Sequence, residues 1–100
     1  MKRVIVRYKV KADKAQENIN YVKKVFKELN ESAPAGLRYA TFVQPDGVSF
    51  IHIASIETED GKNPLSESPA FADFQKEIKD RCEIPPQPVE LTDVGSYNLF

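Results

Sequence analysis

The chain has 100 residues, of which 41% are hydrophobic and 29% are charged, and this length suits a single domain over residues 1–100. Its formal net charge of −1 argues against a nucleic-acid partner, because such proteins need a cationic surface. No apolar run reaches the roughly 20 residues of a membrane span, and the lone cysteine, Cys82, which cannot form an internal disulfide, is typical of a reducing cytoplasm.

The first half of the chain predicts a strand, a long helix and a hairpin. Apolar residues alternate over residues 3–10 and then recur at helical spacing over residues 14–31. Residues 37–44 and 48–57 alternate again on either side of Pro45-Asp46-Gly47. An Asp-Gly pair between two alternating runs is a strong signal of a β-hairpin. This half therefore predicts the order strand, helix, strand, strand.

The second half predicts one more helix and one more strand. Ser68 can cap a helix that has Pro69 in its first turn, and apolar residues at helical spacing continue to Cys82. The proline-rich residues 84–88 predict an extended connection, and residues 89–100 predict a last strand. The complete order is that of the α+β ferredoxin-like fold, βαββαβ, with a four-stranded antiparallel sheet.

The Asp46-Gly47 turn decides which residues of the hairpin share a face of the sheet. A two-residue turn pairs Val43 with Phe50, and Thr41 with His52. We assign to the helix-covered face a set with many β-branched members: Val4, Val6, Tyr8, Phe42, Ile51 and Ile53. The opposite, open face then carries the following residues: Ile5, Arg7, Lys9, Tyr39, Val43, Phe50, His52 and Ile56.

The open face of this predicted sheet is half apolar, whereas a solvent-facing antiparallel sheet is normally polar. Such a patch exceeds what monomeric proteins usually expose. A second copy of the chain is the simplest cover for it. We therefore expect a homodimer that is joined through this sheet face.

His52 is the only histidine of the chain and the candidate catalytic residue. A histidine titrates near neutral pH and can transfer protons, and Tyr39 or Thr41 is placed to orient it. The alternative is a half-buried histidine that only makes hydrogen bonds at an interface. A catalytic role predicts a cavity of a few hundred Å³ beside His52.

Further residues are candidates for binding a ligand. Arg7 supplies a positive charge, and Asp93 is expected to pair with it if the last strand lies beside the first. Tyrosine hydroxyl groups can bind a ligand oxygen. The predicted ligand-binding set consists of Arg7, Tyr39, Thr41, Phe50, Asp93 and Tyr97. No histidine or cysteine lies at metal-ligand spacing, so we expect no metal site.

Three segments carry a resemblance to a known family: Val10-Lys11-Ala12-Asp13, the Pro45-Asp46-Gly47 hairpin, and Ser68-Pro69-Ala70-Phe71-Ala72-Asp73-Phe74. Over nearly its whole length the chain resembles the antibiotic biosynthesis monooxygenase-like family of the dimeric α/β-barrel superfamily. The resemblance implies a homodimer whose two sheets close into a barrel, with a pocket in each protomer between sheet and helices. Relatives include cofactor-independent oxygenases of electron-rich polycyclic phenols and haem-degrading enzymes, and we expect no cofactor.

Three functions stay open at this point. The first is that of a small homodimer which resembles the cofactor-independent monooxygenases and binds an aromatic or apolar metabolite in a sheet-lined pocket. The alternative is a non-catalytic dimeric binding or scaffold module, in which the inner face only holds two chains together. A third possibility is a ligand-sensing domain with its ligand at the seam of the dimer.

Overall fold

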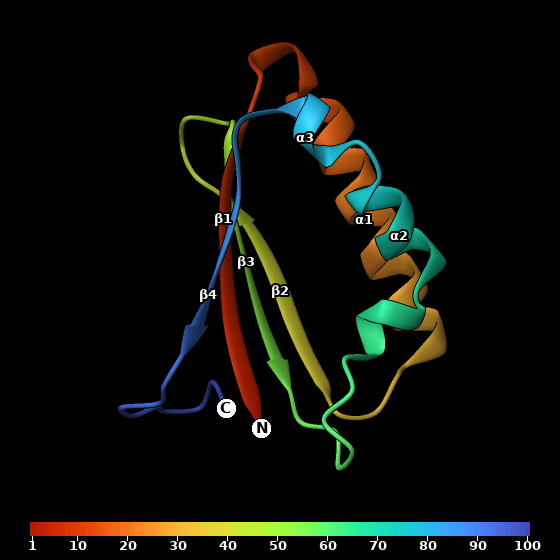
Figure 1. Cartoon of the computed structure of the whole chain (residues 1–100), viewed down its shortest axis with the longest axis vertical. Coiled ribbons are helices and arrows are strands. Elements are labelled where there is room, and N and C mark those ends of the chain that lie inside the picture. Colours follow the sequence, from red (N-terminus) through yellow and green to blue (C-terminus); the bar gives the residue numbers. More distant parts are fainter.

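Four strands form one antiparallel sheet in the computed structural model, which describes residues 1–100. The strands are β1 (Lys2–Val10), β2 (Leu37–Val43), β3 (Ser49–Ile56) and β4 (Cys82–Leu91), in the spatial order β2-β3-β1-β4. The α-helices are α1 (Ala15–Ser32), α2 (Pro69–Gln75) and α3 (Ile78–Arg81), all of which lie on one side of the sheet (Figure 1). The predicted ferredoxin-like βαββαβ fold is confirmed. None of the helices combines the length and the hydrophobicity that crossing a bilayer requires.

The hairpin register is also confirmed. Val43 pairs with Phe50, and Thr41 pairs with His52. The carboxylate of Asp46 accepts hydrogen bonds from the backbone N–H groups of Val48 at 3.0 Å and of Ser49 at 2.9 Å. These bonds hold the turn, and the turn sets the pairing of the two strands.

The assignment of faces is wrong for the hairpin. Val6 of β1 pairs with His52 and Tyr8 pairs with Phe50, so the hairpin aromatics share the face of Val6 and Tyr8 that the helices cover. The residues that face the helices therefore include Tyr39, Phe50, His52 and Ile56. The open face carries Ile5, Arg7, Lys9, Phe42, Ile51 and Ile53. The sequence contains no signal for the β1–β3 register, because these strands have no short turn between them.

The last strand begins seven residues earlier than predicted, since β4 spans Cys82–Leu91 rather than residues 89–100. The proline-rich segment is part of the strand, because β4 is an edge strand and needs hydrogen bonds on one side only. Arg7 pairs with Gln87 and Lys9 pairs with Ile84. Between these two pairs β4 therefore has one residue more than β1. The prolines at positions 85 and 86 lie in the resulting bulge.

The predicted second helix is broken into α2 and α3. Glu77, between the two, has a φ of 61°, which lies in the left-handed region and ends α2. The guanidinium group of Arg81 donates hydrogen bonds to the carbonyl oxygens of Phe74 at 2.6 Å and of Lys76 at 3.3 Å. Arg81 thus satisfies backbone acceptors that the break leaves without helical partners.

Ser68 and Glu28 fasten α2 to α1. The Ser68 hydroxyl accepts a hydrogen bond from the backbone N–H of Phe71 at 3.0 Å and donates to the Glu28 carboxylate at 2.7 Å. The same carboxylate accepts the backbone N–H of Ala70 at 2.9 Å. The first turn of α2 is therefore held by a cap and by the neighbouring helix together.

We predict that Ser68→Ala lowers the free energy of unfolding by about 1–2 kcal/mol, because the substitution removes a helix cap and one donor to Glu28. Ser66→Ala is the matched control, since the Ser66 hydroxyl bonds only the exposed carbonyl of Asn63. Urea denaturation of the three proteins measures the difference. Equal losses in the two variants would contradict the role given to Ser68.

Candidate functional site

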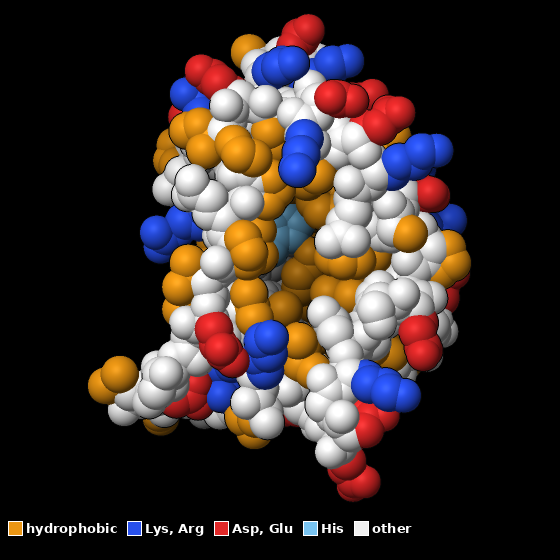
Figure 2. Space-filling model, in the orientation of Figure 1, with side chains coloured by type: hydrophobic (Ala, Val, Ile, Leu, Met, Phe, Trp, Pro, Cys, Tyr) orange, Lys and Arg blue, Asp and Glu red, His pale blue; other side chains and the backbone are white.

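A cavity of about 620 Å³ lies between the sheet and the helices. Figure 2 shows it as a hollow with the histidine of the chain at its floor and hydrophobic side chains on its walls. Positively charged side chains lie above and below the hollow in this view, and an acidic one adjoins the lower of them. Of the 19 residues that line it, 10 are hydrophobic. The polar side chains in the lining are Lys2, Tyr8, Tyr39, His52, Asn63, Gln75 and Lys79.

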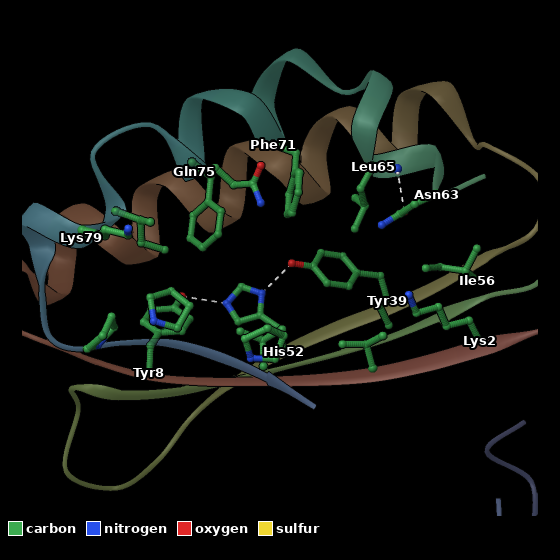
Figure 3. A pocket seen from close by; sticks show the side chains of 18 of the residues that line it. Lys2, Tyr8, Tyr39, His52, Ile56, Asn63, Leu65, Phe71, Gln75 and Lys79 are labelled. Atoms are coloured by element: carbon green, nitrogen blue, oxygen red, sulfur yellow. Dashed lines mark hydrogen bonds between the residues drawn. The ribbon is translucent and has the colours of Figure 1, made fainter. Parts of the chain in front are cut away.

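Each wall of the cavity comes from a different part of the fold. Strands β1, β2 and β3 supply the floor with Tyr8, Tyr39 and His52 (Figure 3). Phe71 of α2 stands opposite in Figure 3, and Phe74, three residues on along the same helix face, also lines the cavity. The three prolines of β4 close one side. Two of them lie in the bulge of that strand. The cavity is thus a space between two layers, which no single element could form.

His52 is held at both ring nitrogens by tyrosine hydroxyl groups. Its Nε2 lies 2.7 Å from the hydroxyl of Tyr8, and its Nδ1 lies 2.5 Å from the hydroxyl of Tyr39 and 3.1 Å from that of Thr41. Figure 3 shows the two tyrosines on opposite sides of the imidazole. The ring has no freedom to rotate without breaking these bonds, so its orientation is fixed.

The hydrogen bonds continue behind Tyr8 into the helices. Asn18 of α1 donates from Nδ2 to the Tyr8 hydroxyl at 2.9 Å, and Arg81 of α3 lies with its Nε 3.4 Å from the Asn18 Oδ1. Arg81, Asn18, Tyr8 and His52 are each at most 5% exposed. A buried polar chain of this kind stabilises a fold only when every member has its partner.

The hydrogen bonds from Arg81 to His52 all run in one donor-to-acceptor direction, and this direction assigns the tautomer of the histidine. Arg81 can only donate, so it faces the oxygen of Asn18, and the Asn18 amide N–H₂ faces Tyr8. Tyr8 already accepts that bond and has no other acceptor for its own proton than His52 Nε2. His52 is therefore protonated on Nδ1, which donates to Tyr39. The Tyr39 hydroxyl accepts this bond, has Thr41 as a further hydrogen-bonding neighbour, and lines the cavity.

Burial keeps His52 and its two tyrosine partners uncharged. Loss of hydration lowers the pKa of His52 from 6.5 to about 4, and raises the pKa of Tyr39 to about 12. The pKa of Tyr8 is raised further by burial, despite the opposing hydrogen bond from Asn18. At neutral pH the histidine and both tyrosines are neutral, so they interact with a ligand as hydrogen-bonding groups.

Three of the predicted site residues meet in one place: His52 with Tyr39 and Thr41. Phe50 lies below them in the core, where its ring stacks on Tyr8 with centroids 5.5 Å apart, and it does not line the cavity. Arg7 lies on the open face of the sheet, away from His52. The sequence therefore predicted the contacts around His52, but Phe50 and Arg7 lie outside the cavity that it expected them to line.

The two C-terminal candidates also lie elsewhere. Asp93 forms an ion pair with Arg3 at 2.5 Å and not with Arg7, because β4 ends at Leu91 and the following residues turn back toward the start of β1. Tyr97 is 89% exposed and lies outside any strand. Neither residue lines the cavity.

The sequence reasoning missed Tyr8, Asn18 and Arg81 as parts of the site. A signal was present for two of them. Asn18 is the polar member of an otherwise apolar stripe on α1, and Arg81 follows Phe74 and Ile78 at helical spacing. A polar residue within an apolar stripe indicates a buried hydrogen bond.

The chain has the fold of known oxygenase structures. It is similar to an antibiotic biosynthesis monooxygenase, with 16% identity, a TM-score of 0.76, and coverage of 95% of this chain and 100% of that one. It is similar to SnoaB, a cofactor-independent oxygenase from Streptomyces nogalater, with 13% identity, a TM-score of 0.70, and coverage of 97% and 96%. A protein of unknown function from Nitrosomonas europaea gives 12% identity, a TM-score of 0.74, and coverage of 96% and 91%. At these identities the likeness shows the fold.

The comparisons of sequence give no match. No protein-family model and no curated protein sequence matches the chain.

We predict that the stability of the protein falls as the pH is lowered from 6.5 toward 4. Between these values the unfolded chain binds a proton at His52 that the folded chain does not bind, because the folded-state pKa is about 4. The free energy of unfolding should therefore decrease by about 2 kcal/mol between pH 7 and pH 4.5. His52→Gln should lose this component, whereas the contributions of Asp46 and Glu57, whose pKa values are lowered by hydrogen bonds, stay common to both proteins.

Nuclear magnetic resonance gives an independent measurement. Because His52 is the only histidine, its ring signals need no further assignment. They should show no titration between pH 8 and pH 5. A midpoint near the ordinary value of 6.5 would disprove the neutral, buried state described here.

Proposed function

We propose that this chain, which has the fold of the antibiotic biosynthesis monooxygenase structures, binds an aromatic or apolar small molecule in the cavity between its sheet and its helices. The observation that carries the proposal is the composition of the cavity. Its volume of about 620 Å³ lies in the range of small-molecule pockets, its walls are largely apolar, and three of its polar side chains, Tyr8, Tyr39 and His52, meet at its floor.

The aromatic side chains form one continuous wall for the proposed ligand. Phe71 and Phe74 offer ring faces and edges from α2, and their centroids lie 5.9 Å apart. Tyr39 contacts Phe71 in an edge-on arrangement, with ring centroids 6.4 Å apart. A planar apolar ligand would pack against this wall and direct an oxygen atom to the Tyr39 hydroxyl.

In this proposal His52 orients Tyr39, and it does not abstract a proton. A base with a pKa of about 4 provides little driving force for proton transfer at neutral pH. Its Nδ1 carries a proton and its Nε2 is occupied by Tyr8, so neither nitrogen is a free acceptor toward the cavity. We therefore propose that this chain binds a ligand, and we do not propose for it the oxygenase activity of SnoaB.

We further propose that the protein is a homodimer joined through the open face of its sheet. The apolar side chains on this face are Ile5, Ala40, Phe42, Ile51, Ile53, Val89 and Leu91. Phe42 and Val89 are each more than half exposed, and such side chains gain about 25 cal/mol per Å² when they are buried. This face also supports the second candidate function, that of a non-catalytic scaffold in which only the dimer matters.

Binding is tested with N-phenyl-1-naphthylamine, a neutral aromatic probe that fluoresces in apolar surroundings. We expect saturable binding to the native protein and at least tenfold weaker binding to Ala54→Phe, which places a ring inside the cavity. Ala72→Phe makes the same change on an exposed position of α2 outside the cavity and should bind as the native protein does.

Two results would count against the binding proposal. One is an absence of saturable fluorescence with the native protein. The other is equal affinity of the native protein and Ala54→Phe, provided that both show the same cooperative unfolding transition. Either result would leave the scaffold as the better proposal.

Sedimentation velocity tests the dimer. We expect a species of about twice the 11.3 kDa chain mass at micromolar concentration. Phe42→Asp should shift it to the monomer, because the charge lies on the open face. Val43→Asp is the control, since Val43 is also exposed but lies on the other face of β2. A native protein that sediments as a monomer would refute the dimer.

A further inference from the structure

We infer that the cavity selects organic anions: ligands with an apolar body and a negatively charged, oxygen-bearing group. The inference rests on the proposed function and narrows it to a class of ligand. Two observations carry it, namely the charge of the lining, which comes from two lysines, and the donor character of the polar groups inside.

The lining of the cavity is positively charged and contains no acidic residue. Lys2 and Lys79 are both among its 19 residues, and none of the 19 is Asp or Glu. The whole chain has 15 acidic and 14 basic residues, so the cavity departs locally from an even balance of charge. Neither lysine forms an ion pair, whereas Lys9, Lys14, Arg3 and Arg38 each do. Two ammonium groups at the cavity are thus free for an anion.

The two lysines stand at opposite ends of the cavity. Lys2 comes from the start of β1, and Lys79 comes from α3 on the helix layer (Figure 3). Both residues are exposed, so their ammonium groups remain hydrated while their aliphatic stems pack along the apolar wall. Positive charges at the entrance of an apolar cavity raise the local concentration of anions, because the low-dielectric walls focus the field.

The polar groups inside the cavity present hydrogen-bond donors. The Asn63 side-chain oxygen already accepts the backbone N–H of Leu65 at 3.0 Å, so its N–H₂ group is what remains for a ligand. The Tyr39 hydroxyl accepts from His52 and has Thr41 beside it, and it carries an O–H donor of its own. The Gln75 side chain adds an N–H₂ donor, together with an amide oxygen. Donors match the acceptor-only oxygens of a carboxylate, a sulfonate or a phenolate.

A cationic ligand is disfavoured by the same features. An ammonium group in the cavity would lose hydration and would find no carboxylate side chain in return. A neutral apolar ligand would bury the same surface and forgo the attraction of Lys2 and Lys79. The charge of the ligand therefore decides its affinity once its apolar body fits.

A matched pair of probes tests this inference. 1-Anilinonaphthalene-8-sulfonate and N-phenyl-1-naphthylamine share one aromatic frame and differ by the sulfonate group. We expect the native protein to bind the sulfonate about tenfold more tightly at low salt. The double variant Lys2→Met, Lys79→Met should abolish this preference. Lys23→Met, Lys27→Met removes two exposed lysines of α1 outside the cavity and should preserve it.

Salt provides a second measurement on the native protein, which does not depend on how the variants fold. Raising the NaCl concentration from about 20 to about 300 mM should weaken binding of the sulfonate and leave the neutral probe unchanged, because screening acts on charge. Ala54→Phe should reduce binding of both probes, which ties the signal to the cavity and excludes adsorption elsewhere on the surface.

The possible failures are distinguishable. Equal affinities for the two probes, or a preference that survives Lys2→Met, Lys79→Met, would overturn the anion inference and leave the proposed binding function intact. An absence of binding by either probe would overturn the binding function and the inference together. A salt effect of equal size on both probes would also reject the role of the two lysines.

Discussion

A buried histidine that must stay uncharged is the constraint on which the rest of this structure depends. His52 lies in the middle of the sheet, and the cost of burying an imidazolium lowers its pKa to about 4. The neutral ring still has one donor and one acceptor to satisfy. Tyr8 and Tyr39 satisfy them, and Tyr8 in turn needs Asn18 and Arg81. One group in β3 thereby fixes residues in β1, β2, α1 and α3.

This chain of hydrogen bonds explains why the helix layer stands where it does. Arg81 reaches Asn18 from α3, which follows the end of α2 at Gln75 and the left-handed residue Glu77, and the same guanidinium satisfies the carbonyls at that break. Phe74 packs directly on His52 and Tyr8 of the sheet, with ring centroids 5.3 and 6.3 Å apart. The cavity lies beside this contact, between the sheet and the helices.

The likeness to the oxygenase structures is a likeness of architecture. Identities between 12% and 16% with TM-scores above 0.7 mean that the same layers are built from different side chains. The fold provides a space between sheet and helices, and the side chains determine what can enter it. Here they are aromatic walls, a donor-presenting Tyr39, and two lysines without ion-pair partners. These features support a binding function more directly than they support proton transfer.

The sequence by itself determined the order of the elements, the first strand, the long helix and the hairpin register, because local spacing and the Asp46-Gly47 turn depend on neighbours along the chain. It misplaced the start of the last strand and missed the break between α2 and α3. It also singled out His52 with Tyr39 and Thr41, which the register brings together. Only the tertiary structure decided which face of the sheet the helices cover, since the pairing of β1 with β3 is set by contacts far apart in sequence. The sequence analysis expected His52 on the open face of the sheet, at a dimer interface. The pairing of β1 with β3 instead places it under the helices, where it lines the cavity and is the neutral centre of a chain of hydrogen bonds.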